Sequence, residues 1–122
     1  MPKILILDDE EIYRDELSKA AKEAGYERFM AGDGDSALEI SRRERFDVVS
    51  TDLGHQGAKA TEVWREARKQ NPNVKVILYT SIKDPEEAKG ADFYLCKRLE
   101  GSIDDYRWML EDAKCRLPEK PE

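Results

Sequence analysis

The sequence has few cysteines, no long hydrophobic run and no excess of positive charge, and each shortage argues against a class of protein. Its two cysteines, Cys96 and Cys115, do not have the spacing of metal ligands, so we expect reduced thiols in a cytoplasmic protein. No hydrophobic run approaches the length of a membrane span, and the first residues do not form a signal-peptide pattern. We therefore expect neither a cysteine-bound metal nor a membrane-embedded segment.

The charge balance of the chain is acidic. Aspartate and glutamate number 27, lysine and arginine number 21, and the formal net charge is -6. A negatively charged domain is repelled by the phosphate backbone, which argues against direct binding to nucleic acid. The length of 122 residues is enough for one hydrophobic core but too small for two ordinary domains.

The apolar residues predict a regular alternation of strands and helices. Short apolar runs predict strands at 3–7, 28–31, 47–51, 74–79 and 92–96. Helical spacing of apolar residues predicts helices at 11–24, 33–43, 60–70 and 102–117. Alternating strands and helices form a parallel sheet that is covered on both faces. The stretch 81–89 has little apolar periodicity, so we expect the fourth helix to be about one turn long or missing.

Polar side chains follow the predicted strands at the point where each strand ends. Asp8 and Asp9 follow the first strand, and Asp52, Thr80 and Lys97 follow the third, fourth and fifth. Because the carboxyl ends of parallel strands meet at one edge of a sheet, we expect these side chains to share a small site. Carboxylates that lie close together repel one another and favour a hard divalent cation such as Mg²⁺. Three carboxylates beside one ammonium group indicate a phosphoryl-transfer site and suggest a phosphorylated aspartate.

Five segments of the chain, in order and on the expected elements, carry a family resemblance. They read ILILDDE at 4–10, GDGDSALE at 32–39, FDVVSTDL at 46–53, VILYTS at 76–81 and GADFYLCK at 90–97. Together they resemble the receiver domains of two-component response regulators, and the resemblance covers residues 3–117. It implies an α/β, flavodoxin-like fold in which five parallel strands take the order 2-1-3-4-5, with helices on both faces.

The resemblance implies roles for the acidic residues and for one glycine. Asp52 would be the phosphoacceptor and would carry a 4-aspartylphosphate. Asp8 and Asp9 would hold Mg²⁺, with Asp52 and the backbone carbonyl of Gly54 as further ligands. Mg²⁺ is therefore the expected cofactor, and water molecules would complete its octahedron.

Three further residues would act on the phosphoryl group or respond to it, according to the same resemblance. Lys97 would pair with Asp52 at rest and with the phosphoryl group afterwards, which neutralises the charge of the transition state. Thr80 would assist by donating a hydrogen bond to a phosphoryl oxygen, and it would be drawn inward as the switch hydroxyl. Tyr94 would be the switch aromatic, which fills the space that the threonine leaves and changes the nearby surface.

The chain lacks prolines in two loops where the family usually has them. The loop after Asp52 reads LGHQG, so we expect it to be more mobile and to place the metal less rigidly. Arg98 follows Lys97, and a cis bond before a non-proline residue costs about 2.5–4 kcal/mol, so we expect a trans bond or a distorted loop. His55 is the only histidine, and we expect it in a solvated loop, with a tuning effect of its charge on the site as the alternative.

The two tryptophans have different expected environments. Trp64 lies on the apolar stripe of its helix, so we expect it in the core. Trp108 and Cys115 lie off the stripe of the last helix, where they form either a partner-facing patch or scattered exposed residues.

We interpret residues 1–117 as a receiver domain and residues 118–122 as a polar tail or the start of a linker. The domain would take a phosphoryl group from a sensor histidine kinase and switch a surface for an unknown output partner. We expect a monomer or weak homodimer that assists its own phosphoryl transfer and is otherwise not an enzyme. Two alternatives stay open: an interaction module of receiver shape that works without phosphate, and a Mg²⁺-dependent aspartyl phosphatase.

Overall fold

The computed structural model of the chain describes residues 1–82, 85–97 and 101–115. Five strands form one parallel sheet in the order β2-β1-β3-β4-β5, which confirms the predicted fold class. The strands are β1 (Lys3–Leu7), β2 (Glu27–Ala31), β3 (Val48–Thr51), β4 (Lys75–Thr80) and β5 (Phe93–Cys96). The helices are α1 (Glu11–Glu23), α2 (Gly34–Arg43), α3 (Ala60–Gln70), α4 (Pro85–Ala88) and α5 (Ser102–Cys115).

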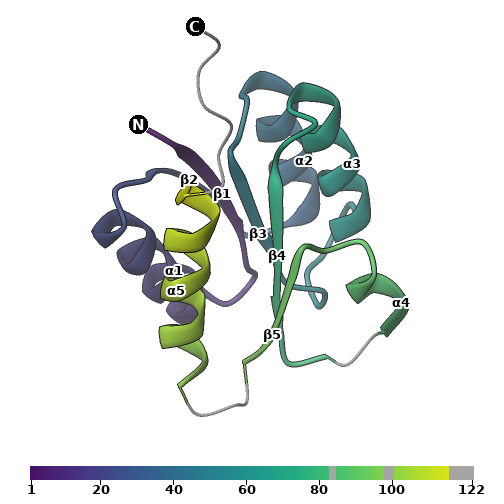
Figure 1. Cartoon of the computed structure of the whole chain (residues 1–122). Coiled ribbons are helices and arrows are strands. Elements are labelled where there is room, and N and C mark those ends of the chain that lie inside the picture. Colours follow the sequence, from purple (N-terminus) through teal and green to yellow (C-terminus); the bar gives the residue numbers. More distant parts are fainter. Residues whose placement is uncertain (83–84, 98–100, 116–122) are drawn as a thin grey trace, which may run out of the picture.

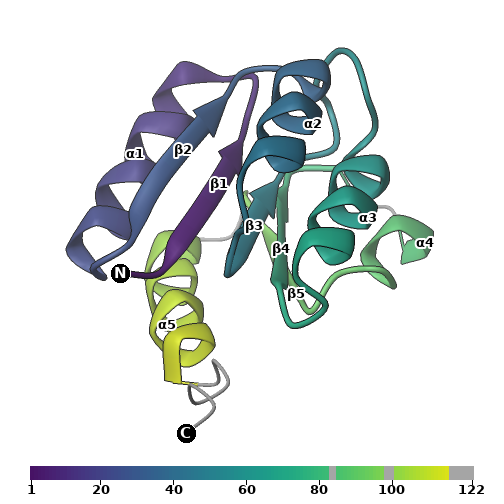
Figure 2. The ribbon, with the colours of Figure 1, turned by 90° about the horizontal axis from the view of Figure 1, so that it is seen from above.

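Helices cover both faces of the sheet (Figure 1). α1 and α5 lie on one face, while α2, α3 and the short α4 lie on the other, a division that the turned view in Figure 2 also shows. Successive side chains of a strand point to opposite faces, so β1 contributes to two cores. Ile4 and Ile6 join the core under α1 and α5. Leu5 and Leu7 join the core under α2 and α3.

The carboxyl ends of the central strands are aligned at one edge of the sheet. Leu7 of β1 lies beside Thr51 of β3, which in turn lies beside Leu78 of β4. At the end of β4, Thr80 lies beside Cys96 of β5. The residues that follow these strands therefore emerge together, as the sequence predicted.

The ends of three helices are defined by local interactions that the sequence supports. The carboxylate of Asp33 accepts a 2.8 Å hydrogen bond from the backbone N–H of Ser36 and caps the start of α2. Gly25 follows α1 with a φ of 87°, a left-handed conformation that favours glycine. The buried amide of Asn71 donates a 2.8 Å hydrogen bond to the carbonyl of Phe46, which joins the end of α3 to the segment before β3.

Among its described residues, the crossover between β4 and β5 contains one short helix. α4 has 4 residues, so the prediction of a short fourth helix is confirmed. The predictions for the bond before Arg98 and for the tail 118–122 lie outside the described residues. In the part of the chain that the structure describes, no helix combines the length and the apolar character that a membrane crossing requires.

Candidate functional site

Three carboxylates gather beyond the ends of β1 and β3. Asp8 and Asp52 are buried, with 0% and 3% of their surface exposed, whereas Asp9 is open to solvent. One carboxylate oxygen of each residue lies within 4.8 Å of the others. The backbone N–H of Asp9 also donates a 3.4 Å hydrogen bond to Asp52 Oδ2. The fold therefore brings together the acidic residues that the sequence singled out.

The ammonium group of Lys97 lies between the two buried carboxylates. Its Nζ atom is 2.6 Å from Asp8 Oδ2 and 3.9 Å from Asp52 Oδ2. The rings of Tyr13 and Tyr79 also lie near it, with centroids 4.4 Å and 5.8 Å from Nζ, an arrangement that favours a cation. The predicted pairing with Asp52 at rest is thus the longer of two contacts, and the shorter one is to Asp8.

His55 lies inside the site, so the expectation of a solvated loop histidine is wrong. Only 2% of its side chain is exposed. Its Nδ1 atom is 2.7 Å from Asp52 Oδ1, and its Nε2 atom is 2.8 Å from the carbonyl oxygen of Ala58. The physical reason is the burial of Asp52, because a carboxylate oxygen removed from water needs a hydrogen-bond partner from the protein.

The two contacts of the His55 ring determine where a proton lies. A backbone carbonyl only accepts, so the nitrogen that faces Ala58 carries a hydrogen. The other nitrogen lies 2.7 Å from Asp52 Oδ1, and a hydrogen bond at this distance requires a proton on either the ring nitrogen or the carboxyl group. Burial raises the pKa of the Asp52 carboxyl, and the hydrogen bond to Asp52 raises the pKa of the His55 ring. Both shifts favour a proton in the contact between the imidazole and the carboxylate.

The loop between β3 and α3, residues 53–59, is tied to the start of α2. The backbone N–H of Gly34 donates a 2.7 Å hydrogen bond to the carbonyl of Gln56. The backbone N–H of Ala58 donates a 3.0 Å hydrogen bond to Asp35 Oδ1. The two segments approach so closely that a Cβ atom on Gly34 would lie 1.8 Å from the carbonyl oxygen of Ala58. Hydrogen bonds to α2 therefore hold this loop, and its expected mobility stays a prediction.

Thr80 and Tyr94, the predicted switch pair, both bond to the backbone of Ile82. Thr80 is buried, and its Oγ1 atom accepts a 3.1 Å hydrogen bond from the N–H of Ile82. The hydroxyl of Tyr94 donates a 3.2 Å hydrogen bond to the carbonyl of the same residue, while 37% of Tyr94 remains exposed. Ile82 thus connects the two side chains, a link that the sequence did not predict.

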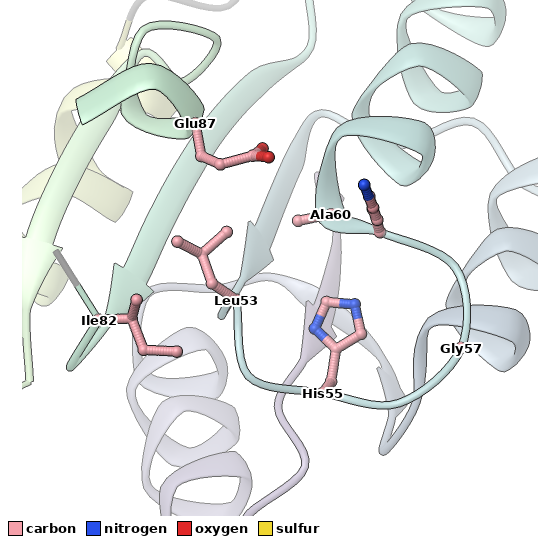
Figure 3. Close-up of a pocket in the computed structure, with 7 residues that line it drawn as sticks. Leu53, His55, Gly57, Ala60, Ile82 and Glu87 are labelled. Atoms are coloured by element: carbon pink, nitrogen blue, oxygen red, sulfur yellow. The ribbon is translucent and has the colours of Figure 1, made fainter. Parts of the chain in front are cut away.

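A pocket of about 220 Å³ lies beside the imidazole of His55. In Figure 3, the His55 ring rises from the loop after β3, with Leu53 and Ile82 to its left and Ala60 above it. The pocket is lined by Leu53, His55, Gly57, Lys59, Ala60, Ile82 and Glu87. There is therefore unfilled space next to a side chain that contacts the predicted phosphoacceptor.

The acidic cluster has the composition of a site for a hard divalent cation. Carboxylate oxygens are the ligands that Mg²⁺ prefers, and Asp8, Asp9 and Asp52 each offer one within a small volume. These residues fit the ion that the sequence predicted. The part of the Gly54 carbonyl in metal binding stays a prediction.

Comparison with known proteins decides the family. The family model of the response regulator receiver domain matches residues 4–101. The chain belongs to this family. The receiver domain is 34% identical over 100 residues to the probable transcriptional regulatory protein TcrX of Mycobacterium tuberculosis. This alignment covers 77% of this chain and 42% of that protein. It is 36% identical over 103 residues to the sensory transduction protein RegX3 of Mycolicibacterium smegmatis, and this alignment covers 80% of this chain and 44% of that protein. The chain therefore spans less than half the length of these relatives.

Solved structures also resemble the receiver domain. The response regulator protein TrrA from Thermotoga maritima, solved in complex with Mg²⁺ and BeF, has a TM-score of 0.78 and 29% identity, over 93% of this chain and 99% of that one. A response regulator receiver domain protein from Clostridium thermocellum has a TM-score of 0.77 and 27% identity, over 95% of this chain and 96% of that one. These similarities agree with the sheet order and the two helical layers described above.

Two contacts of the receiver domain were hidden from sequence analysis. The spacing of three residues between Asp52 and His55 was visible, but it did not show that the loop turns the ring back onto the carboxylate. The link of Ile82 to Thr80 and Tyr94 gave no signal in the sequence, because it is made by the backbone groups of Ile82. Both contacts depend on loop conformation, which the apolar pattern of the chain does not encode.

Proposed function

We propose that this receiver domain accepts a phosphoryl group on Asp52 from a phosphorylated histidine of a sensor kinase and thereby alters a partner-binding surface. The observation that carries the proposal is the position of Asp52. It is buried at the end of β3, clustered with Asp8 and Asp9, and 3.9 Å from the ammonium group of Lys97. A carboxylate in these surroundings can act as a nucleophile while its neighbours neutralise the transferred charge.

The proposed transfer uses groups that are close together in the site. One oxygen of Asp52 forms a bond to phosphorus while the P–N bond of the donor histidine breaks, and the electron pair returns to the donor ring, which takes up a proton from solvent. Lys97 then neutralises charge on the phosphoryl oxygens. Thr80 accepts a hydrogen bond from Ile82 and keeps its own O–H to donate to a phosphoryl oxygen. Lys97 and Thr80 would in this way assist the transfer and the later hydrolysis.

The proposal includes Mg²⁺ as the cofactor. Asp8, Asp9 and Asp52 would hold it together with the backbone carbonyl of Gly54, and the ion would supply positive charge for the phosphoryl oxygens. The complex of TrrA with Mg²⁺ and BeF supports this assignment by similarity.

Movement of Thr80 toward the phosphoryl group would provide the signal. It would disturb the hydrogen bond to Ile82, whose carbonyl holds the hydroxyl of Tyr94. Tyr94 lies on β5 at the edge of the sheet and is partly exposed, so its movement would change the surface there. Trp108 on α5 is also exposed and is a second candidate contact for the output partner.

The proposed partners are a sensor histidine kinase and an output protein or domain. The names of TcrX and RegX3, a transcriptional regulator and a sensory transduction protein, support a role in signal transduction. We assign the receiver domain to residues 1–117, as a monomer or weak homodimer. Membership in the receiver family favours this interpretation over an aspartyl phosphatase.

Intact mass measurement after incubation with acetyl phosphate and Mg²⁺ tests the proposal. We expect the wild type to gain the mass of one phosphoryl group and Asp52→Asn to gain none. Asp104→Asn removes an exposed carboxylate from α5 and should be labelled like the wild type. Full labelling of Asp52→Asn would show that Asp52 is not the phosphoacceptor. An unlabelled wild type would instead support an interaction module that works without phosphate.

A further inference from the structure

His55 occupies one oxygen of the proposed phosphoacceptor. Its Nδ1 atom lies 2.7 Å from Asp52 Oδ1, and its side chain is buried at 2% exposure. The phosphoacceptor role of Asp52, on which this inference rests, gives no task to that histidine. We propose that His55 is a positioning residue that latches Asp52 in a resting state and must release Oδ1 before the carboxylate can engage metal and phosphoryl group together.

The reaction proposed for Asp52 needs both of its oxygens. One oxygen forms the bond to phosphorus, and the other faces the metal site. At rest, Oδ2 lies near the ammonium of Lys97 and the N–H of Asp9, at 3.9 Å and 3.4 Å. Oδ1 is held by the imidazole, and a hydrogen bond on an oxygen makes it a weaker ligand and a weaker nucleophile. The latch therefore opposes both Mg²⁺ binding and phosphorylation.

Hydrogen bonds to the start of α2 hold the latch in place. The imidazole donates to the carbonyl of Ala58 through Nε2, and the N–H of Ala58 donates to Asp35 Oδ1 at 3.0 Å. The N–H of Gly34 holds the same loop through the carbonyl of Gln56. A hydrogen-bonded path thus runs from α2 through the loop to Asp52. Loss of the Asp35 contact should loosen the ring from Asp52 without any change at His55 itself.

The released ring has a space to enter. The pocket of about 220 Å³ adjoins the imidazole and is bounded by Leu53 and Ile82 (Figure 3). The backbone of Ile82 holds both Thr80 and Tyr94. Entry of the ring into this pocket would bring it against Ile82 and would therefore link the latch to the switch pair.

Replacement of His55 gives the first test. His55→Phe keeps a ring of similar size without the hydrogen bond, and His55→Ala removes the ring. Loss of a charge-assisted hydrogen bond predicts roughly tenfold tighter Mg²⁺ binding in both variants, measured by NMR titration, together with faster labelling by acetyl phosphate. Gln56→Ala, which changes an exposed side chain of the same loop and keeps its backbone carbonyl, should bind Mg²⁺ like the wild type.

Replacement of Asp35 separates the latch from a simple effect of charge. Removal of a negative charge alone weakens binding of a cation, whereas opening of the latch strengthens it. We expect Asp35→Ala, which loses the acceptor for Ala58, to bind Mg²⁺ more tightly than the wild type. Asp35→Asn loses the same charge but keeps an acceptor oxygen, so it should not show this gain.

The single histidine also allows direct observation of the latch. Its ring nitrogens give one set of NMR signals, and we expect them to shift when Mg²⁺ alone is added, as the ring leaves Asp52. Ring signals that stay unchanged at saturating Mg²⁺, or His55 variants with wild-type affinity and labelling, would overturn the latch while labelling of Asp52 still supports the proposed function. Slower labelling of both His55 variants would overturn it too, because it would mean that the ring assists the transfer. A wild type that takes up no phosphoryl group would overturn the proposed function, and the latch with it.

Discussion

The indole N–H of Trp64 donates a 3.0 Å hydrogen bond to the hydroxyl of Thr51, the residue that precedes Asp52. Both side chains are 1% exposed, so the prediction that Trp64 belongs to the core is confirmed. The bond joins α3 to the last residue of β3. The position of the proposed phosphoacceptor is therefore linked to the packing of a helix on the sheet.

Replacement of Trp64 by phenylalanine should destabilise the domain. The variant leaves the buried hydroxyl of Thr51 without its donor, and an unsatisfied buried polar group costs about 1–3 kcal/mol. Loss of part of the indole volume adds to this cost. Urea denaturation should therefore show a lower midpoint for Trp64→Phe. Trp108→Phe is the matched control, because 62% of Trp108 is exposed and its replacement should change the midpoint little.

Replacement of Gly34 by alanine should displace the loop between β3 and α3. The added Cβ atom would lie 1.8 Å from the carbonyl oxygen of Ala58, so the loop or the start of α2 must shift. Overpacking of this kind costs about 1–3 kcal/mol of unfolding free energy. Gly32→Ala should be milder, because its Cβ would meet only the side chain of Arg14, at 3.2 Å. Equal stability of the two variants, measured by chemical denaturation, would contradict the close approach.

Addition of Mg²⁺ should change the NMR signals of a limited set of amides. If the acidic cluster holds the ion, residues 8–10, 52–55 and 80–82 should move first, because they surround the proposed ligands. Removal of the ion with EDTA should restore the original spectrum. Amides of these segments that stay still at millimolar Mg²⁺ would mean that the metal site is wrongly assigned.

Replacement of Thr80 by alanine should separate phosphorylation from its consequence. The hydroxyl is neither the acceptor nor a proposed metal ligand, so mass measurement should still detect a labelled domain. The shift of the Tyr94 signals on phosphorylation should shrink, since Thr80 no longer pulls on Ile82. Tyr94→Phe is the counterpart, because it breaks the other bond to Ile82 and keeps the threonine. A labelled Thr80→Ala domain with the spectrum of the labelled wild type would remove Thr80 from the mechanism.

The sequence predicted the sheet well because the pattern of apolar residues is simple. β1 and β3 are buried on both faces and appear as short continuous apolar or small-residue runs, and both were found within one residue of their observed bounds. The short fourth helix was also predicted, since the segment before Gly90 offers few apolar positions to pack. These features depend on residue type along the chain and need no knowledge of loop shape.

The site was predicted only in part. The clustering of Asp8, Asp9, Asp52 and Lys97 was predicted because strand ends place them together, and strand ends are visible in the sequence. The burial of His55 was missed because it depends on hydrogen bonds between Ala58, Asp35 and the imidazole. Such contacts join a loop to a helix that precedes it in the chain, and no periodic pattern marks them.

The contact between Lys97 and Asp8 also bears on how the chain matures. The ribosome synthesises Asp8 and Asp52 well before Lys97, which follows the edge strand β5. A nascent chain that lacks this strand has two carboxylates to bury and no ammonium group between them, and the repulsion opposes their burial. Docking of β5 on β4 supplies the missing positive charge. We therefore expect the acidic site to form only after β5 has been synthesised and has docked on β4, because Lys97 is the residue of the cluster that is made latest.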